Sequence, residues 1–316
     1  MAHILLTGGA GFIGSHVASA LLARGDAVTV LDNFNDFYDP RLKRANATAL
    51  QGARIVEGDI RDAALLAKLF GEGRFDGLIH LAAMAGVRPS LKDPLHYEDV
   101  NCRGTLLLLE QARARPGLKF VFASSSSVYG DNEKVPFRED DDIHHPVSPY
   151  AATKRAGELY CYTHHHLYGI PISALRFFTV YGPRQRPEMA IAKFTKLIAE
   201  GKPVPFFGDG TTRRDYTYID DIVQGVLASY DRCAGYEIYN LGESATTSLA
   251  ELVDTIGRAL GKTPVLDRQP NQPGDVPITY ADVSKAKQKL GYKPTTPLAE
   301  GVTKYVAWCR ATGLIR

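Results

Sequence analysis

The sequence has few of the residues that build disulfide frameworks and thiolate metal sites. Four of its 316 residues are cysteine, at positions 102, 161, 233 and 309, and no two of them have the CxxC spacing. This usage is typical of buried free thiols in a reducing compartment. The chain does not begin with a basic stretch and a cleavable apolar core, so we expect no secretory signal and a cytoplasmic protein.

A strong net charge and long apolar segments are also missing. Lys and Arg number 37 against 35 Asp and Glu, a formal net charge of +2, which gives no long-range attraction to nucleic acid or to an anionic membrane. The apolar runs fall far short of the ~20 residues that cross a bilayer. We therefore expect neither nucleic acid nor a membrane as a partner, and an anionic ligand must be met by local groups.

The first half alternates short apolar runs with amphipathic segments. The predicted strands are His3–Thr7, Ala27–Leu31, Arg54–Glu57, Gly77–His80, Lys119–Ala123 and Ile172–Phe177. The predicted helices are Phe12–Arg24, Ala63–Phe70, Pro94–Arg113 and Pro149–Tyr168. Strands that alternate with crossover helices indicate an α/β fold with a doubly wound, Rossmann-type parallel sheet.

Glycines follow the first predicted strand at fixed spacing. The segment 7–14 reads TGGAGFIG, with Gly8, Gly11 and Gly14 between a strand and an amphipathic helix. A pyrophosphate at a helix N-terminus needs bare backbone N–H groups, and the last glycine lets helix and strand touch. This context makes the motif a strong prediction of a dinucleotide cofactor.

An acid at the end of the second strand selects the cofactor. Asp32 is placed to accept hydrogen bonds from the adenosine ribose and to repel a 2′-phosphate, which favours NAD over NADP. The basic run 41–44 could contradict this, but we interpret it as a solvated helix face. Asp59, after the third strand, is placed to reach the adenine edge. The predicted cofactor contacts are Gly8, Gly11, Phe12, Ile13, Gly14, Asp32, Asn33, Asp59, Ile60, Leu81, Ala82, Ala83, Asn101, Tyr150 and Lys154.

The composition changes after residue 180, where Gly and Pro become dense. Helices are predicted over Asp221–Arg232, Ser248–Leu260 and Leu298–Arg310, and a strand over Tyr236–Asn240 could rejoin the first domain. We predict two parts: an NAD-binding domain of residues 1–180 plus about 216–242, and a smaller C-terminal α/β substrate-binding cap of about 181–215 plus 243–316. A cleft between them is the expected ligand site.

Tyr150 and Lys154 open the predicted helix 149–168 and share one of its faces. Lowering the pKa of a tyrosine from near 10 to 7 takes about 4 kcal/mol. A neighbouring ammonium and an oxidised nicotinamide both favour the phenolate, so Tyr150 is a candidate base. Ser125, in the serine-rich end of the fifth strand, lies where α/β sheets place ligands and can share the substrate proton.

With these motifs the chain resembles the extended short-chain dehydrogenase/reductase family over essentially its whole length, and within it the nucleotide-sugar epimerases. Segments 35–44, 85–90 and 176–187 are similar to those of UDP-glucuronate 4-epimerases. The resemblance implies a catalytic triad of Ser125, Tyr150 and Lys154. It also implies that Asn101 lies near the cofactor and that Arg214 contacts the nucleotide phosphates.

The same resemblance bears on the reaction. Related 4,6-dehydratases carry an Asp-Glu pair after the catalytic hydroxyl residue, and decarboxylases keep an acid there, whereas this chain has Ser126 and Ser127. NAD-dependent 4-epimerisation of UDP-glucuronate to UDP-galacturonate, through a transient 4-keto sugar, is therefore expected. The alternatives are a UDP-glucose/UDP-galactose 4-epimerase, a UDP-glucuronate decarboxylase and a non-catalytic NAD-sensing protein.

A sugar carboxylate needs its own binding group, because the 4-keto form of a uronic acid is a β-keto acid that readily loses carbon dioxide. Arg186 and Thr179 are the candidates for this grip, with Arg88 as a secondary one. Thr179 stands where hexose epimerases usually have Asn, which favours an acidic sugar. The predicted substrate contacts are Arg88, Ser125, Ser126, Ser127, Thr179, Arg186, Arg214 and Asp275.

Two further expectations concern partners. His164, His165 and His166 are consecutive on a helix and point in different directions, so no metal site is expected. The resemblance implies a homodimer in which helices 94–113 and 149–168 pair across the interface. The apolar residues available on these helices are Leu106, Leu109, Leu159 and Tyr162.

Overall fold

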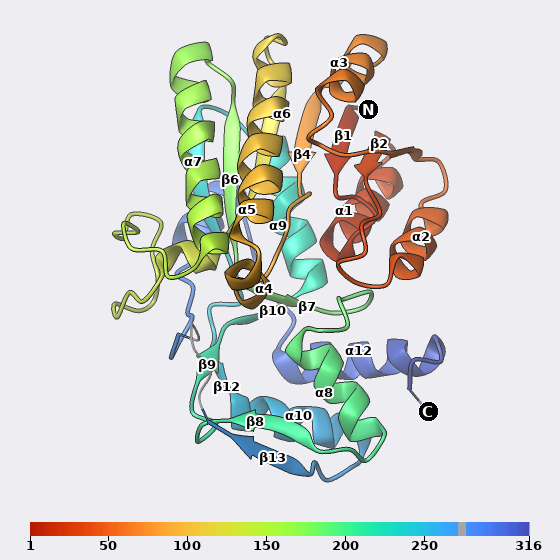
Figure 1. Ribbon diagram of the computed structural model, residues 1–316, viewed down its shortest axis with the longest axis vertical. Helices are drawn as coiled ribbons and strands as arrows, with labels where there is room; N and C mark the ends of the chain where they lie inside the picture. Colours follow the sequence, from red (N-terminus) through yellow and green to blue (C-terminus); the bar gives the residue numbers. More distant parts are fainter. Residues whose placement is uncertain (271–275, 316) are drawn as a thin grey trace.

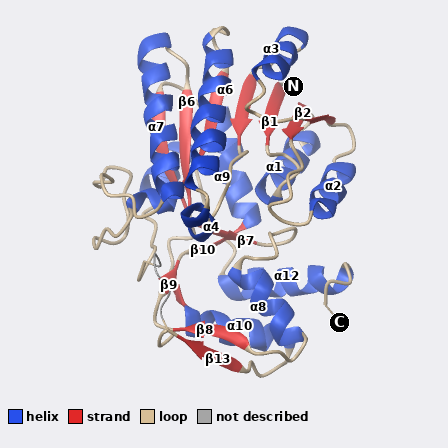
Figure 2. Ribbon diagram, in the orientation of Figure 1, coloured by secondary structure: helices blue, strands red, loops and turns tan. Residues whose placement is uncertain are grey.

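A seven-stranded parallel sheet forms the centre of the molecule (Figures 1 and 2), in a computed structural model that describes residues 1–270 and 276–315. The strand order is β11-β6-β5-β4-β1-β2-β3. The strands are β1 (His3–Thr7), β2 (Ala27–Asp32), β3 (Arg54–Glu57), β4 (Gly77–His80), β5 (Lys119–Ser125), β6 (Ile172–Phe177) and β11 (Tyr236–Leu241). The doubly wound sheet and the return of the strand near residue 236 are therefore confirmed.

Helices cover both faces of this sheet, as the two-sided burial of its apolar strands requires. On one face α1 (Phe12–Ala23) packs against α9 (Ile219–Asp231), and on the other α3 (Ala63–Glu72), α6 (Gly104–Arg113) and α7 (Pro149–Tyr168) lie side by side. Each face has its own hydrophobic cluster. The sheet is thus buried on both sides, and its carboxyl edge is left for a ligand.

The segment predicted as one helix over 94–113 is helical throughout, but its hydrogen-bond pattern changes in the middle. It consists of α5 (Pro94–Glu98), a π-helical turn (Asp99–Arg103) and α6. Within the turn, Asn101 is buried and its carboxamide bonds both the N–H and the C=O of Met84, at 2.8 and 3.0 Å. The irregular turn therefore fastens the loop that follows β4 at the carboxyl edge of the sheet.

A smaller layer faces the carboxyl ends of the strands (Figure 1). It contains α8 (Ala190–Ala199), α10 (Leu249–Leu260), α12 (Leu298–Ala311) and a parallel pair of strands, β8 (Val204–Phe207) and β13 (Leu266–Gln269). The remaining elements are α2 (Pro40–Ala49), α4 (Val87–Lys92), α11 (Ser284–Leu290), β9 (Arg213–Arg214) and β12 (Thr247–Ser248). This is the expected α/β cap; α8, within the Gly- and Pro-rich stretch, was not predicted.

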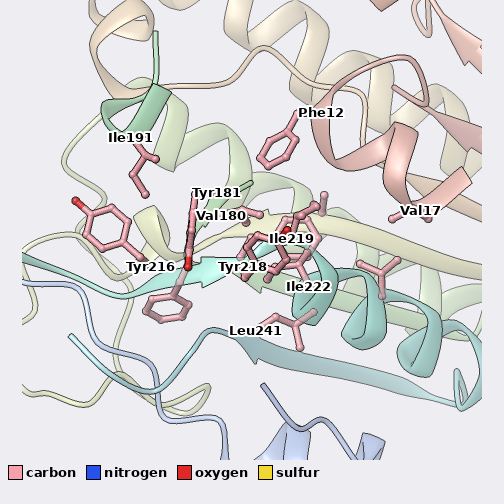
Figure 3. Packing of buried hydrophobic residues seen from close by; sticks show 14 of the residues in the cluster. Phe12, Val17, Val180, Tyr181, Ile191, Tyr216, Tyr218, Ile219, Ile222 and Leu241 are labelled. Carbon is pink, nitrogen blue, oxygen red and sulfur yellow. The ribbon is translucent and has the colours of Figure 1, made fainter. Parts of the chain in front are cut away.

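The cap and the sheet domain share one hydrophobic cluster. Strands β7 (Thr179–Tyr181) and β10 (Tyr216–Tyr218) pair in parallel at the junction. Figure 3 shows their tyrosines packed between Phe12 of α1, Ile191 of α8 and Ile219 of α9. The two parts are therefore joined by continuous apolar packing.

No helix among residues 1–270 and 276–315 has both the length and the apolar character needed to cross a membrane.

A buried ion pair fastens α7 to the sheet. Arg176 of β6 donates from Nε and Nη2 to the two carboxylate oxygens of Glu158, at 2.8 and 3.0 Å, and both side chains are about 1 % exposed or less. The Ser124 hydroxyl donates to Glu158 at 2.6 Å, and Tyr129 accepts from Arg176 at 2.9 Å. Because every charge is paired and hydrogen-bonded, removal of one partner leaves the other as a buried charge.

We expect Arg176→Met to lower the free energy of unfolding by up to about 3–5 kcal/mol, because the buried Glu158 carboxylate then keeps only Arg155, at 3.2 Å from Oε2, as its cation. Urea denaturation measures this loss. The exposed pair Arg258–Asp254 on α10 supplies the control, since Arg258→Ala should cost less than about 1 kcal/mol. The double variant Arg176→Met/Glu158→Leu should recover much of the loss; a double variant as unstable as the single one would contradict this account.

Candidate active site

A cavity runs along the carboxyl edge of the sheet, past the ends of β1, β2, β3, β4, β5 and β6. Its volume is about 390 Å³. Nearly all of the predicted site residues line it: Gly8, Gly11, Phe12, Ile13, Gly14, Asp32, Asn33, Asp59, Ile60, Leu81, Ala82, Ala83, Ser125, Ser126, Ser127, Tyr150, Lys154, Thr179 and Arg186. Residues from six strand ends and two helices therefore meet in one place.

The glycine loop forms one wall of this cavity, and its shape excludes side chains. Gly8 has φ +71°, and a β-carbon there would lie 2.7 Å from the backbone nitrogen of Ala82. A β-carbon at Gly14 would lie 2.1 Å from the Gly8 carbonyl oxygen. No side chain caps the N-terminus of α1, so its first N–H groups remain for a ligand anion, as the spacing predicted.

Acidic side chains lie at the β2 and β3 end of the cavity. Asp32 is buried and accepts from the N–H groups of Ala10 and Phe34, at 3.0 and 2.9 Å, so it also fixes the glycine loop. Burial raises the pKa of this carboxyl group. Asp59 accepts from Asn33 at 2.9 Å and pairs with Arg61, whose hydrogen bonds lower the pKa of Asp59. Both acids remain within reach of an adenosine.

The basic run 41–44 is not a uniformly solvated face, and that interpretation is wrong for Lys43. Arg41 and Arg44 are exposed, but Lys43 is 5 % exposed and lines the cavity. Its Nζ donates to the backbone oxygen and to Oδ1 of Asn35, at 2.8 and 2.6 Å. The spacing of charged residues along α2 does not reveal that Lys43 is buried, because its hydrogen-bond acceptor, Asn35, lies in the loop before the helix.

That loop turns back over the glycine loop. Phe34 has φ +50°, and its N–H is held by Asp32, so residues 35–38 curl toward the cavity. Tyr38 Oη lies 4.0 Å from the position a Gly11 β-carbon would take, and it is buried with no hydrogen-bond partner among the described residues. Burial raises the pKa of Tyr38 to about 12. A neutral hydroxyl donor therefore faces the glycine loop with an unmet hydrogen bond.

Ser125, Tyr150 and Lys154 meet at the β5 end of the cavity. The Lys154 ammonium lies 5.9 Å from the Tyr150 ring centroid and donates to the Ala123 carbonyl oxygen at 2.7 Å. Burial lowers the pKa of Lys154 to about 8. Burial raises the pKa of Tyr150, while the Ser125 hydroxyl and the Arg186 guanidinium lower it. Ser125 and Arg186 thus oppose the effect of burial on the pKa of Tyr150.

Arg186 brings a guanidinium to the same end of the cavity. Its side chain is 21 % exposed, and Nε pairs with Glu188 Oε1 at 3.2 Å. Thr179 opens β7 and also lines the cavity. The carboxylates among the described lining residues are Asp32 and Asp59. A serine, a tyrosine and a cation therefore line the cavity together, and the acid beside them, Glu188, is paired with Arg186.

Four of the predicted residues do not line the cavity or cannot be placed. Asn101 lies behind the wall and acts on it through Met84. The Arg88 guanidinium lies 5.6 Å from the Phe207 ring in the cap, and Arg214 donates to the Arg213 carbonyl oxygen at 2.8 Å. Asp275 is outside the described residues. Of the three arginines predicted to bind substrate, Arg186 lines the cavity, and Arg88 and Arg214 do not.

Comparison with known proteins adds to this geometry. The sequence profile of the family described as GDP-mannose 4,6 dehydratase matches residues 5–305. The chain belongs to this family of extended short-chain dehydrogenases/reductases.

Relatives within this family include epimerases of known name. A UDP-glucuronate 4-epimerase 1 of Arabidopsis thaliana is 48 % identical over 96 % of this chain and 76 % of its own length. A UDP-glucuronate 4-epimerase of Thermodesulfobacterium geofontis is 44 % identical over 98 % and 97 %. The crystal structure of UDP-glucuronic acid 4-epimerase from Bacillus cereus, in complex with UDP-glucuronic acid and NAD, covers 98 % of this chain and 99 % of its own, with 37 % identity and a TM-score of 0.91.

For this member of the extended short-chain dehydrogenases/reductases, sequence reasoning missed Phe37, Tyr38 and Lys43, which all line the cavity. All three fall in segment 35–44, whose resemblance to the epimerase subgroup was visible. What could not be read was the turn at Phe34 that folds the segment onto the glycine loop, since a positive φ at a phenylalanine has no sequence signal.

We expect Tyr38→Phe to have opposite effects on the free and the NAD-bound protein. Without NAD it removes a buried hydroxyl that lacks a partner, so the melting temperature should stay the same or rise. With NAD it removes a hydrogen-bond donor, so the dissociation constant should rise about three- to tenfold. Calorimetric titration and thermal unfolding measure the two effects, with Arg41→Ala as a control outside the cavity. Equal NAD affinity of variant and parent would refute a role for this hydroxyl.

Proposed function

We propose that the protein is an NAD-dependent UDP-glucuronate 4-epimerase that interconverts UDP-glucuronate and UDP-galacturonate. The observation that carries this assignment is the meeting of Tyr150, Ser125 and the Arg186 guanidinium in one cavity. A tyrosine and a serine can move one proton, and the guanidinium can bind a sugar carboxylate. The relatives described above carry the same name.

The cofactor fits other residues that line the same cavity. The glycine cradle excludes β-carbons, the start of α1 has no side-chain cap, and Tyr38 holds an unpaired donor against the loop. A dinucleotide pyrophosphate would satisfy all three. Asp32 and Asp59 would hold the adenosine end, and their charge favours NAD over NADP. Lys154 would hold the nicotinamide ribose.

Bound NAD would supply the hydride acceptor and donor at sugar C4, by way of a 4-keto sugar. The residues of the chain handle the proton. Tyr150 accepts the proton of the 4-hydroxyl through Ser125 and returns it after the sugar has turned over. Burial raises the pKa of Tyr150, so positive charge added to that of Arg186 favours formation of the base. A bound, oxidised nicotinamide supplies such a charge.

The small side chains of Ser126 and Ser127 leave space for both orientations of the ring. Arg186 and Thr179 are the proposed grip on the carboxylate, which keeps it out of the perpendicular geometry in which a β-keto acid loses carbon dioxide. A guanidinium suits this task, since its planar fork can bind a carboxylate at two points. Arg214 is proposed to bind the phosphates of the UDP portion, and Asp275, which lies outside the described residues, its ribose.

We propose that residues 1–180 with 216–242 bind NAD and that residues 181–215 with 243–316 bind the UDP-sugar.

We also propose a homodimer built on α5–α6 and α7, supported by the exposure of Leu159 and Tyr162, which are 49 % and 52 % exposed. Leu109 takes no part in that surface, contrary to our expectation, because it is buried in the core.

All four cysteines are free and buried, which fits a cytoplasmic enzyme.

Incubation of the NAD-loaded protein with UDP-glucuronate and with UDP-glucose, followed by NMR of the products, tests the function. We expect UDP-galacturonate from the first. Arg186→Ala should lower kcat/KM for UDP-glucuronate by at least about a hundredfold, since a charged hydrogen-bonded contact of about 3 kcal/mol is lost, and should release some UDP-pentose.

The exposed Arg258→Ala variant should be unchanged in both assays. Efficient epimerisation of UDP-glucose with no turnover of UDP-glucuronate would replace the assignment by a neutral-sugar epimerase. Formation of UDP-pentose as the main product of the parent enzyme would indicate a decarboxylase.

A further inference from the structure

The orientation of Arg186 depends on two residues that the proposed reaction does not use. A guanidinium at the end of a flexible side chain binds a carboxylate well only if its planar fork is already aimed, because an ordered side chain loses less entropy on binding. The question is therefore what holds Arg186 in the absence of substrate. Phe37 and Glu188 contact it from different sides.

The ring of Phe37 supports the Arg186 guanidinium. The Arg186 Cζ atom lies 5.5 Å from the Phe37 ring centroid, within the range of a cation–π contact. Phe37 comes from the loop after β2, whereas Arg186 follows β7, so residues distant in sequence meet across the cavity. Both side chains line it.

The Phe37 ring is itself held in place by the buried Lys43. Asn35 Oδ1 accepts from Lys43 Nζ at 2.6 Å and from the Phe37 N–H at 3.2 Å. The same Lys43 ammonium lies 4.7 Å from the Tyr38 ring centroid. The loop is therefore fixed by a buried cation, with Tyr38 Oη next to the glycine loop and the Phe37 ring next to Arg186.

Glu188 holds the Nε side of the guanidinium. Its Oε1 pairs with Arg186 Nε at 3.2 Å, and its side chain is 45 % exposed. No other ion pair of Arg186 occurs within the described part of the chain. A carboxylate on Nε leaves the two terminal nitrogens, Nη1 and Nη2, for a second carboxylate. The guanidinium is thus restrained by an aromatic ring and by a carboxylate at Nε, and the described residues place no ion pair on Nη1 or Nη2.

We propose that Phe37 and Glu188 are positioning residues for Arg186, and that together they set the preference of this site for an acidic over a neutral sugar. This proposal rests on the proposed function, since it concerns the grip on the sugar carboxylate. Phe37 keeps the guanidinium plane in one orientation, and Glu188 directs the Nη pair toward the ligand. A neutral sugar has no carboxylate for Arg186 to bind. Loss of Phe37 or Glu188 therefore weakens binding of UDP-glucuronate and leaves binding of UDP-glucose almost unaffected.

Glu188 also balances charge. With its carboxylate on Nε, Arg186 carries a compensated charge before substrate binds, so part of the attraction to the sugar carboxylate is offset. Replacement by Gln keeps an oxygen acceptor for Nε and removes the negative charge. Glu188→Gln should therefore retain the orientation and strengthen ground-state binding of the acid sugar, whereas Glu188→Ala should lose the orientation.

The test measures selectivity for the carboxylate directly. In a Tyr150→Phe background, which removes the proposed base, dissociation constants of the NAD-loaded protein for UDP-glucuronate, UDP-glucose and UDP are measured by calorimetric titration. The ratio of the UDP-glucose to the UDP-glucuronate constant is the selectivity. Phe37→Leu, which keeps apolar bulk without a π face, should reduce this ratio about fivefold, and Phe37→Tyr should preserve it.

Glu188→Ala should reduce the ratio similarly, and Glu188→Gln should raise it. Glu200→Gln, at an exposed ion pair that follows α8, is the control and should leave the ratio unchanged. Glu188 is exposed, so its variants test the proposal even if Phe37→Leu fails to fold. The constant for UDP alone should be the same in all variants.

Two results separate failure of this proposal from failure of the proposed function. A parent protein that binds UDP-glucuronate no better than UDP-glucose would overturn both. A selective parent whose selectivity survives Phe37→Leu and Glu188→Ala would overturn the positioning role alone. An equal loss of affinity for all three ligands would also overturn it, because a general defect of the cavity would then explain the variants.

Discussion

The buried pair of Arg176 and Glu158 is the constraint on which the site depends. Glu158 lies on α7 four residues after Lys154 and eight after Tyr150, so all three share one helical face. The ion pair holds this face against β6, and the Ser124 hydroxyl ties it to the end of β5. The distance between the serine-rich strand end and the tyrosine is thus set by a charge pair that water does not reach.

A second constraint comes from the opposite side of the cavity. Asp32 binds the glycine loop through Ala10 and the returning loop through Phe34, so one carboxylate sets the distance between the two. Lys43 and Asn35 then fix the aromatic residues that face the cavity. The cofactor end and the proposed carboxylate grip are therefore built by a continuous chain of contacts from β2 to Arg186.

The sequence predicted the sheet almost completely, because its strands are short apolar runs between helices with clear 3.6-residue periodicity. His3–Thr7, Arg54–Glu57 and Pro149–Tyr168 have the predicted limits. The glycine spacing and the pair Tyr150 and Lys154 identified the cavity for the same reason, since local spacing dictates local geometry. These features need no knowledge of distant contacts.

What the sequence could not reveal depends on such contacts. Lys43 looks like its exposed neighbours until Asn35 is brought beside it, and the π-helical turn at Asn101 follows from a bond to Met84. Leu109 has the character of an interface residue and is buried instead. Each of these differences comes from tertiary partners that override a local pattern.

The cluster at β7 and β10 has a mechanical consequence. Tyr181, Tyr218 and Ile191 are each 4 % exposed or less and pack between the two parts. Swinging the cap away would hydrate these side chains, at a cost of about 1.5–3 kcal/mol for each. Hinge opening is therefore disfavoured, and the cavity keeps its shape. A sugar ring that turns over during the proposed reaction must do so within this fixed volume.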